Sequence, residues 1–208
     1  MAMKNCYIHP NALVETIDIG EGTRIWAFAH VMRDVSIGQN CNIGDHAFLE
    51  SGVVVGNGVT IKNNAMLWKG VELADYVFVG PGVIFTNDLY PRSPRLPDAQ
   101  DRYLAEKQWL MKTFVEEGVT IGANSTIICG ILLGRYCTVA AGSVVTKDVP
   151  SFSLVAGNPA RIIGAVNKEG RVLKQRGEEW IHVSTGNRYR LVQGEMRPIV
   201  KKNKKGRE

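Results

Sequence analysis

Apolar residues recur every six positions along most of the chain, from Tyr7 to Phe85 without a miss. The same spacing resumes at Trp109 and continues to Val145. The residue four places after each of these is usually small or β-branched. An α-helix cannot produce a six-residue period, whereas short strands joined by tight turns can, with both residues facing an enclosed axis. The pattern predicts an all-β fold, a parallel β-helix.

Three six-residue units make one triangular turn, so the chain then returns to the same face about 4.8 Å higher. Fourteen units before the gap and seven after it predict about seven turns. Glycine and asparagine recur near the expected corners, where the backbone needs residues that tolerate unusual angles. The outer faces of such a rod are flat and poor in pockets.

The period breaks once, after Phe85, and the segment 91–108 reads as a long excursion loop rich in proline and charge. Loops that stand off a rigid scaffold are where binding groups are placed. If the next six-residue unit starts at Trp109, Thr113 takes the position four places later that is usually a small residue. The insertion is then a whole number of turns, and the residues after it stay on the faces that the repeat predicts. Asn87 would then share one face with Ala123 in the adjacent turn.

On that register, one column of residues runs up the rod through Asn87. Cations below Asn87 would suit a pyrophosphate, and small residues above it would let a pantetheine arm lie against the backbone. In order, the expected column is Arg33, Ser51, Lys69, Asn87, Ala123, Ala141 and Pro159.

The six-residue period ends near Asn167, so we expect two parts, a β-helix domain at 1–165 and an appendage at 166–208. Alternation around glycine turns between Trp180 and Val200 predicts a small β-hairpin in the appendage. Basic residues at 201–207 account for much of the formal charge of +5 but lack interleaved aromatics, so no nucleic acid partner is expected.

The four cysteines form no CxxC pair, which favours reduced thiols and no zinc site. No apolar run is long enough to span a bilayer, and no hydrophobic signal core opens the chain. We therefore expect a soluble, cytoplasmic protein with no metal and no membrane partner.

Five segments carry a resemblance to a known family: RIWAFAHV (24–31), VFVGPGVIFTNDLYPRS (77–93), VTIGANSTIICG (119–130), GRYCTVAAGSVVTKDVP (134–150) and LVAGNPARIIG (154–164). They resemble the left-handed β-helix, hexapeptide-repeat acyltransferases. They look most like the N-acetyltransferases acting on UDP-2-acetamido-3-amino-2,3-dideoxy-glucuronate. The resemblance, and not the periodicity, implies the left-handed sense.

It also implies a homotrimer that binds acetyl-coenzyme A between neighbouring prisms. The implied reaction is N-acetylation of a nucleotide-linked 3-amino sugar, carried by UDP or dTDP, in surface-polysaccharide synthesis. The FTNDLYPRS segment departs from some uronate-specific relatives just after Asn87, which leaves the uronic carboxylate open.

The resemblance places Asn87 beside the amino group that is acetylated. His30 matches a position beside the nucleotide sugar, with a role open between ligand contact and general base. The family often has a second histidine where Ala27 stands here. If His30 is not the general base, Asp88 and Glu50 are the alternative carboxylates for that role. The thiolate that leaves coenzyme A is the remaining proton acceptor.

The resulting site has two halves. The segment around Asn158 and Arg161 closes the top of the coenzyme site in similar enzymes, with the basic residue near the adenosine phosphates. The candidate substrate-binding residues are Arg33, Glu50, Lys69, Asn87 and Arg92, and the candidate coenzyme-binding residues are Ala123, Ala141, Asn158, Pro159 and Arg161.

Three other interpretations stay open on the sequence alone. The acceptor amine could be on C4 of the sugar instead of C3. The same rod could carry a γ-carbonic-anhydrase-like metal site, although His9, His30 and His46 lack the spacing of its ligands. The rod could also be a non-catalytic binding module.

Overall fold

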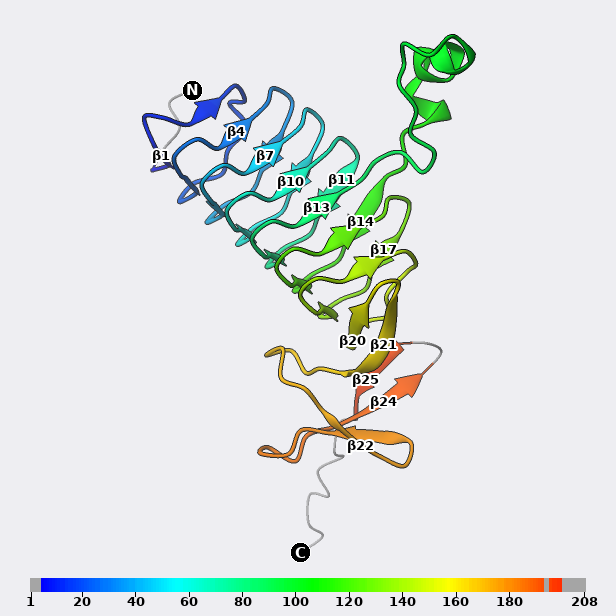
Figure 1. Ribbon diagram of the computed structural model, residues 1–208. Helices are drawn as coiled ribbons and strands as arrows, with labels where there is room; N and C mark the ends of the chain where they lie inside the picture. The colour runs from blue at the N-terminus through cyan, green and yellow to red at the C-terminus, as the bar shows by residue number, and fades with distance from the viewer. Residues whose placement is uncertain (1–4, 193–194, 200–208) are drawn as a thin grey trace, which may run out of the picture.

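The computed structural model describes residues 5–192 and 195–199. The chain winds into a triangular rod, with one long excursion leaving a corner and a small sheet at the C-terminal end (Figure 1). The basic run at 201–207 lies outside the described residues. The predicted all-β parallel coil is confirmed, and its left-handed sense stays a prediction from the family resemblance.

Three sheets, which we call A, B and C, form the faces of the rod. Sheet A contains β1 (Tyr7–Ile8), β3 (Arg24–Ile25), β6 (Asn42–Ile43), β9 (Thr60–Ile61), β12 (Phe78–Val79), β15 (Thr120–Ile121), β18 (Thr138–Val139), β20 (Ser153–Gly157) and the antiparallel β21 (Ala160–Ala165). Sheet B contains β2 (Leu13–Val14), β4 (His30–Val31), β7 (Phe48–Leu49), β10 (Met66–Leu67), β13 (Ile84–Phe85), β16 (Thr126–Ile127) and β19 (Val144–Val145).

Sheet C contains β5 (Ser36–Ile37), β8 (Val54–Val55), β11 (Val71–Leu73), β14 (Thr113–Val115) and β17 (Leu132–Leu133). Within the described chain the rod has about eight turns, one more than predicted. The eighth level is reached on sheet A alone, by β20, which pairs in parallel with β18 although its residues lie beyond the six-residue pattern.

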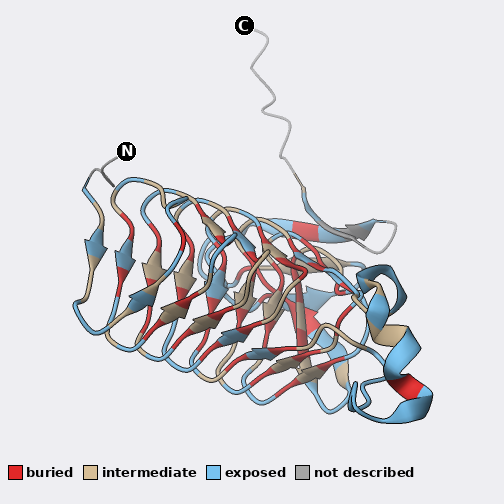
Figure 2. Cartoon of the chain, turned by 90° about the horizontal axis from the view of Figure 1, so that it is seen from above, coloured by how far each residue is buried: buried red, intermediate tan, exposed pale blue. Residues whose placement is uncertain are grey.

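From Ile25 to Phe85 the six-residue pattern places its apolar residues inside the rod, as the buried stripes on successive strands show (Figure 2). At the N-terminal end the predicted register is wrong by one residue, since Tyr7 and Leu13 are exposed and Ile8 and Val14 pair with the inward-facing Ile25 and Val31. Ile25, Ile43 and Ile61 have no exposed surface, and neither do the small residues Ala29 and Ala65. Burying a side chain of this size contributes on the order of 1.5–3 kcal/mol, and the stack repeats that gain at every turn.

Corner residues have a positive φ at six-residue intervals, and glycine or asparagine occupies six of the ten corners between residues 28 and 82, so the predicted role of these residues holds in part. The series runs through Phe28, Asp34, Asn40, His46, Gly52, Gly58, Asn64, Gly70, Tyr76 and Gly82. At Gly122 a close approach sets the requirement instead, since a Cβ there would lie 2.5 Å from the Ala141 amide nitrogen of the next turn. Successive corners therefore stack in direct contact.

The excursion begins and ends at positions different from those predicted. Phe85 pairs with Ile127, whereas the regular spacing would pair it with the position of Tyr103, so four six-residue units are inserted. The chain leaves the rod after Asn87, whose carbonyl oxygen accepts a hydrogen bond from the Met111 amide at 2.9 Å. The excursion includes the 3₁₀ helices η1 (Pro97–Leu104) and η2 (Glu106–Gln108).

The prediction that a strand unit restarts at Trp109 is wrong, because that indole packs on Tyr103 of the excursion, with ring centroids 5.9 Å apart. The expected burial of Thr113 is confirmed, and the chain re-enters the interior there. The insertion is therefore one six-residue unit longer than predicted, and everything after it moves by one face of the rod.

The C-terminal part is larger than the predicted hairpin. The strands β22 (Lys174–Arg176), β23 (Glu179–Ile181), β24 (Arg188–Val192) and β25 (Glu195–Pro198) form an antiparallel sheet. A second cluster of buried residues ties it to the end of the rod: Phe152, Ala165, Leu173 and Tyr189. No helix among the described residues is long and apolar enough to cross a bilayer.

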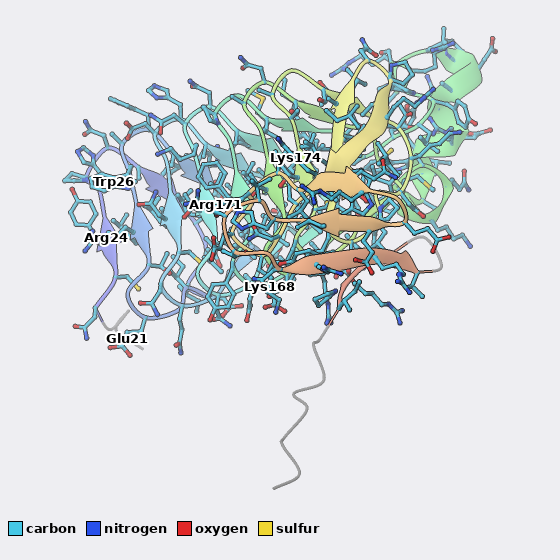
Figure 3. All side chains as sticks on the ribbon, turned by 90° about the horizontal axis from the view of Figure 1, so that it is seen from below. Glu21, Arg24, Trp26, Lys168, Arg171 and Lys174 are labelled. Atoms are coloured by element: carbon cyan, nitrogen blue, oxygen red, sulfur yellow. The ribbon has the colours of Figure 1, made fainter. Side chains whose placement is uncertain are left out.

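The turn 167–170 lies against sheet A, where it lines a hollow together with Thr120 and Thr138. On that side of the molecule Arg24 and Trp26 lie toward the N-terminal end, and Lys168, Arg171 and Lys174 lie toward the other end (Figure 3). The turn 167–170 thus covers part of sheet A, and charged side chains lie along the same side of the molecule.

Candidate active site

The corner between sheets B and C carries most of the candidate residues. The pairing of β4, β7, β10 and β13 stacks their following turns in order, so Arg33, Ser51, Lys69 and Asn87 lie one above another. This lower half of the predicted column is confirmed. Neighbouring parallel strands are about 4.8 Å apart, which fixes the height of each residue along the rod.

The upper half of the predicted column is wrong. Cys129, not Ala123, follows Asn87 at this corner, and the Cys129 amide donates to Thr86 Oγ1 at 2.9 Å. Ala123 and Ala141 lie at the corner between sheets A and B, where the Gly142 amide donates to the Ala123 oxygen at 2.8 Å. The cause is the extra six-residue unit of the excursion, which moves the alanines to the other edge of sheet B.

The predicted coenzyme-binding residues nevertheless lie together, at the corner between sheets A and B. The Gly157 amide donates to Ser143 Oγ at 3.3 Å, which sets the turn containing Asn158 and Pro159 above Ala141. Both turn residues and Arg161 are exposed. Small residues with open surface beside them form a narrow lane along this edge of the rod.

Asp88, beside Asn87, anchors the excursion. Its carboxylate accepts hydrogen bonds from Tyr103 Oη at 2.8 Å, from the Tyr90 amide at 2.9 Å and from both terminal nitrogens of Arg102. The hydrogen bond from Arg102 lowers the pKa of this carboxyl below its ordinary value. A carboxylate with these partners is a poor base, so the contacts favour a positioning role over the catalytic one predicted for Asp88.

His30 lies too far from Asn87 to serve as its base. Three strand spacings separate β4 from β13, about 14 Å along the rod, whereas proton transfer needs hydrogen-bond contact. His30 Nε2 lies 2.8 Å from Glu15 Oε1, and this hydrogen bond lowers the pKa of the Glu15 carboxyl. Between the two roles left open for His30, the geometry favours ligand contact.

A surface hollow of about 370 Å³ lies next to Glu15 at the lower end of the B–C corner. Arg33 Nε approaches Glu15 Oε2 at 3.6 Å, and both residues line the hollow. Glu15 had no usable signal in the sequence, because β2 pairs with β4 at a spacing of 17 residues, Leu13 with His30, and not at the 18 of the repeat.

The remaining candidates also have defined contacts. Glu50 Oε2 accepts a hydrogen bond from the Lys69 amide at 2.7 Å, and Lys69 Nζ pairs with Glu106 of the excursion. The Arg92 amide donates to Tyr103 Oη at 2.9 Å, and its exposed guanidinium donates to the neighbouring Pro91 oxygen. The parts played by Arg102, Tyr103 and Glu106 had no signal in the sequence, because the excursion follows no period.

The described part of the chain lacks a set of side chains that could bind a metal ion together. No group of three or more histidine, cysteine, aspartate or glutamate side chains is placed there to hold an ion.

A dTDP-3-amino-3,6-dideoxy-alpha-D-galactopyranose 3-N-acetyltransferase of Aneurinibacillus thermoaerophilus is 44% identical to this chain, over 95% of the chain and 97% of the relative. The chain belongs to the hexapeptide-repeat acetyltransferases. Two family descriptions agree, "Hexapeptide repeat of succinyl-transferase" at 34–69 and 112–147 and "Bacterial transferase hexapeptide (six repeats)" at 16–51. The match to an N-acetyltransferase over nearly the whole chain shows that the protein is an acyl-coenzyme A dependent N-acetyltransferase, and the carbonic anhydrase and non-catalytic alternatives are set aside.

Solved structures show the same fold. A point mutant of AntD, an N-acyltransferase from Bacillus cereus in complex with dTDP and coenzyme A, superposes with a TM-score of 0.58 at 22% identity, over 80% of this chain and 83% of that one. A hexapeptide-repeat acetyltransferase from Vibrio cholerae, in complex with acetyl-coenzyme A, gives 0.50 at 25% identity, over 61% and 68%.

We expect Asp88→Asn and Arg102→Met to loosen the excursion, because each removes the charge pairing at its root. Limited proteolysis should cut within 89–108 faster in both variants. Asp98→Asn, an exposed carboxylate of the same loop, is the matched control and should behave as wild type.

The same anchor should depend on pH. The pKa of Asp88 is lowered in the folded state. The stabilisation that its carboxylate gives to the excursion is therefore complete above the ordinary aspartate pKa of about 3.9 and is lost as the pH falls through the lowered value. Wild-type protection should therefore decline only in strong acid. Equal cutting of Asp88→Asn and wild type at neutral pH would contradict the anchoring role.

Proposed function

We propose that this protein transfers the acetyl group of acetyl-coenzyme A to the 3-amino group of a dTDP-linked 3-amino-3,6-dideoxyhexose. The relative that matches nearly the whole chain carries this activity in its name. A dTDP complex of a protein with the same fold is in keeping with that nucleotide. We place the enzyme in the cytoplasm, in surface-polysaccharide synthesis.

The division of the candidate site between two edges of sheet B supports a second part of the proposal, that two chains share one active site. Asn87 lies at the B–C edge, and Ala123 and Ala141 lie at the A–B edge. Strand β13 separates them within one chain, but reacting atoms must come within about 3–3.5 Å. A second copy of the chain is therefore needed to complete the site.

A homotrimer with sheet B facing its axis would meet this requirement, because the A–B edge of each prism then adjoins the B–C edge of the next. The outer face of sheet B suits that position, with Leu13, Met66 and Ile84 exposed and apolar. Sheet A is partly covered by the turn 167–170, and sheet C carries the charged pair Lys112–Glu72.

The heights of the candidate residues along the rod support a proposed place for each ligand. The lane of small residues rises from Ala123 to Pro159 on the C-terminal side of Asn87, where the coenzyme A arm would lie. Lys69 and Arg33 lie below Asn87, where the diphosphate and nucleoside would lie. The acetyl thioester and the sugar amine then meet at the level of Asn87.

Orientation carries most of the proposed chemistry. The Asn87 amide oxygen accepts an amine N–H and directs the nitrogen lone pair at the thioester carbon. The C–N bond forms, the C–S bond breaks, and the proton released from nitrogen passes to the departing thiolate. The thiolate is the acceptor we propose, because Asp88 is already paired with Arg102, and His30 and Glu50 lie three and two strand spacings away.

The purified protein should release free thiol from acetyl-coenzyme A with dTDP-3-amino-3,6-dideoxygalactose, and the sugar nucleotide should gain the mass of an acetyl group. UDP-linked and 4-amino analogues, with the 3-amino uronate, complete the panel. Faster turnover of a 4-amino sugar, or no turnover of any member, would overturn the proposed substrate.

Asn87→Ala should lower kcat by about one to three decades, or roughly 1.4–4 kcal/mol, because the amine is no longer oriented. The oligomeric state should not change. Asn57→Ala removes the same side chain at the corner between sheets C and A and should retain wild-type kcat. An unchanged rate in Asn87→Ala would refute the assignment.

Ile84→Glu should break the proposed trimer, because it would bury a charge at the centre of the sheet B interface. Light scattering would then give the monomer mass, and transferase activity should fall with it. Val54→Glu is the matched control, since Val54 is 44% exposed on sheet C and Ile84 is 41% exposed on sheet B. A trimer that survives Ile84→Glu but not Val54→Glu would place sheet C at the axis instead.

A further inference from the structure

Lys69 is the cation nearest to Asn87 in the B–C column, one turn below it. Its backbone amide is held by Glu50 Oε2 at 2.7 Å, and its side chain is 35% exposed. The side-chain ammonium is paired with the carboxylate of Glu106 in the excursion. Within the described chain, this ion pair joins the excursion directly to the scaffold turn beneath it.

The proposed substrate would bring its own anion to that place. In a nucleoside diphosphate sugar the β-phosphate is a few covalent bonds from the C3 nitrogen. With the nitrogen at Asn87, the β-phosphate falls about one strand spacing lower, ~5 Å. That is the height of Lys69, so phosphate and Glu106 would compete for one ammonium group.

We propose that Glu106 is an internal competitor for the diphosphate, and that substrate binding exchanges its carboxylate for a phosphate oxygen on Lys69. This inference rests on the proposed function. The diphosphate carries two negative charges against one on the exposed Glu106 carboxylate, and an exposed ion pair of this kind is worth at most about 1 kcal/mol, so the exchange proceeds in the direction of binding.

The exchange needs only a side-chain movement. The root of the excursion is held separately by Asp88 with Arg102, and by the hydrogen bond from the Met111 amide to the Asn87 oxygen. Glu106 itself is exposed. Its carboxylate can therefore leave Lys69 while Asn87 keeps its position.

The chain offers a matched control for charge. Glu72 pairs with Lys112 at 2.9 Å, also between the scaffold and the end of the excursion, but on sheet C. Glu72→Gln and Glu106→Gln each remove one negative charge and one such pair. Only the second removes an anion from the ammonium of Lys69.

The test is binding of dTDP to the full-length protein, measured by calorimetry at low and high salt. Glu106→Gln should bind dTDP about two- to fivefold more tightly at low salt, the range set by a partly exposed ion pair. The difference should shrink at high salt because such pairs are screened. Glu72→Gln should match wild type.

Lys69→Met should weaken dTDP binding by about tenfold or more and cancel the effect of Glu106→Gln in the double variant. An equal gain from Glu106→Gln in the Lys69→Met background would overturn the inference, and so would unchanged or weaker binding by Glu106→Gln alone. Failure of the wild-type protein to bind dTDP would instead contradict the proposed function, and this inference with it.

Discussion

The constant spacing of stacked parallel strands is the constraint on which the rest of this molecule depends. Each turn is hydrogen-bonded to the next at nearly the same distance, as in Phe48 N to Ala65 O and Met66 N to Val83 O, both 2.9 Å. The apolar interior fills the space between those bonds, so no turn can tilt or slide without opening a void. Residue number therefore determines height along the rod, and the candidate site can be measured in strand spacings.

A flat-sided rod has little capacity to enclose a ligand by itself. In this chain the candidate binding residues lie along two different edges of one sheet. The small residues that suit coenzyme A follow one edge of sheet B, and the polar residues that suit a nucleotide sugar follow the other. The excursion departs from the second edge directly after Asn87. The proposed assembly thus serves catalysis as well as stability, since it brings two incomplete edges together.

Acidic side chains near the B–C corner are already engaged, which shapes the proposed chemistry. Asp88 is bound by Arg102, Glu15 by His30, and Glu50 by the Lys69 amide. These contacts fix the carboxylates in place, so they favour positioning over proton transfer. Orientation of the amine and departure of a thiolate then become the main contributions, and Lys69 becomes the group for which phosphate and protein compete.

The sequence by itself determined the parallel coil, the burial of the six-residue pattern from Ile25 to Phe85, the order of Arg33, Ser51, Lys69 and Asn87, and the family. These follow from local repetition, because each turn repeats the geometry of the one before. Only the tertiary structure decided where the excursion ends. No period governs that loop, and Trp109 fits the apolar pattern yet packs on Tyr103 instead of the core. That single difference moved Ala123 and Ala141 to the opposite edge of sheet B and divided the predicted single column into two, one at each edge of that sheet.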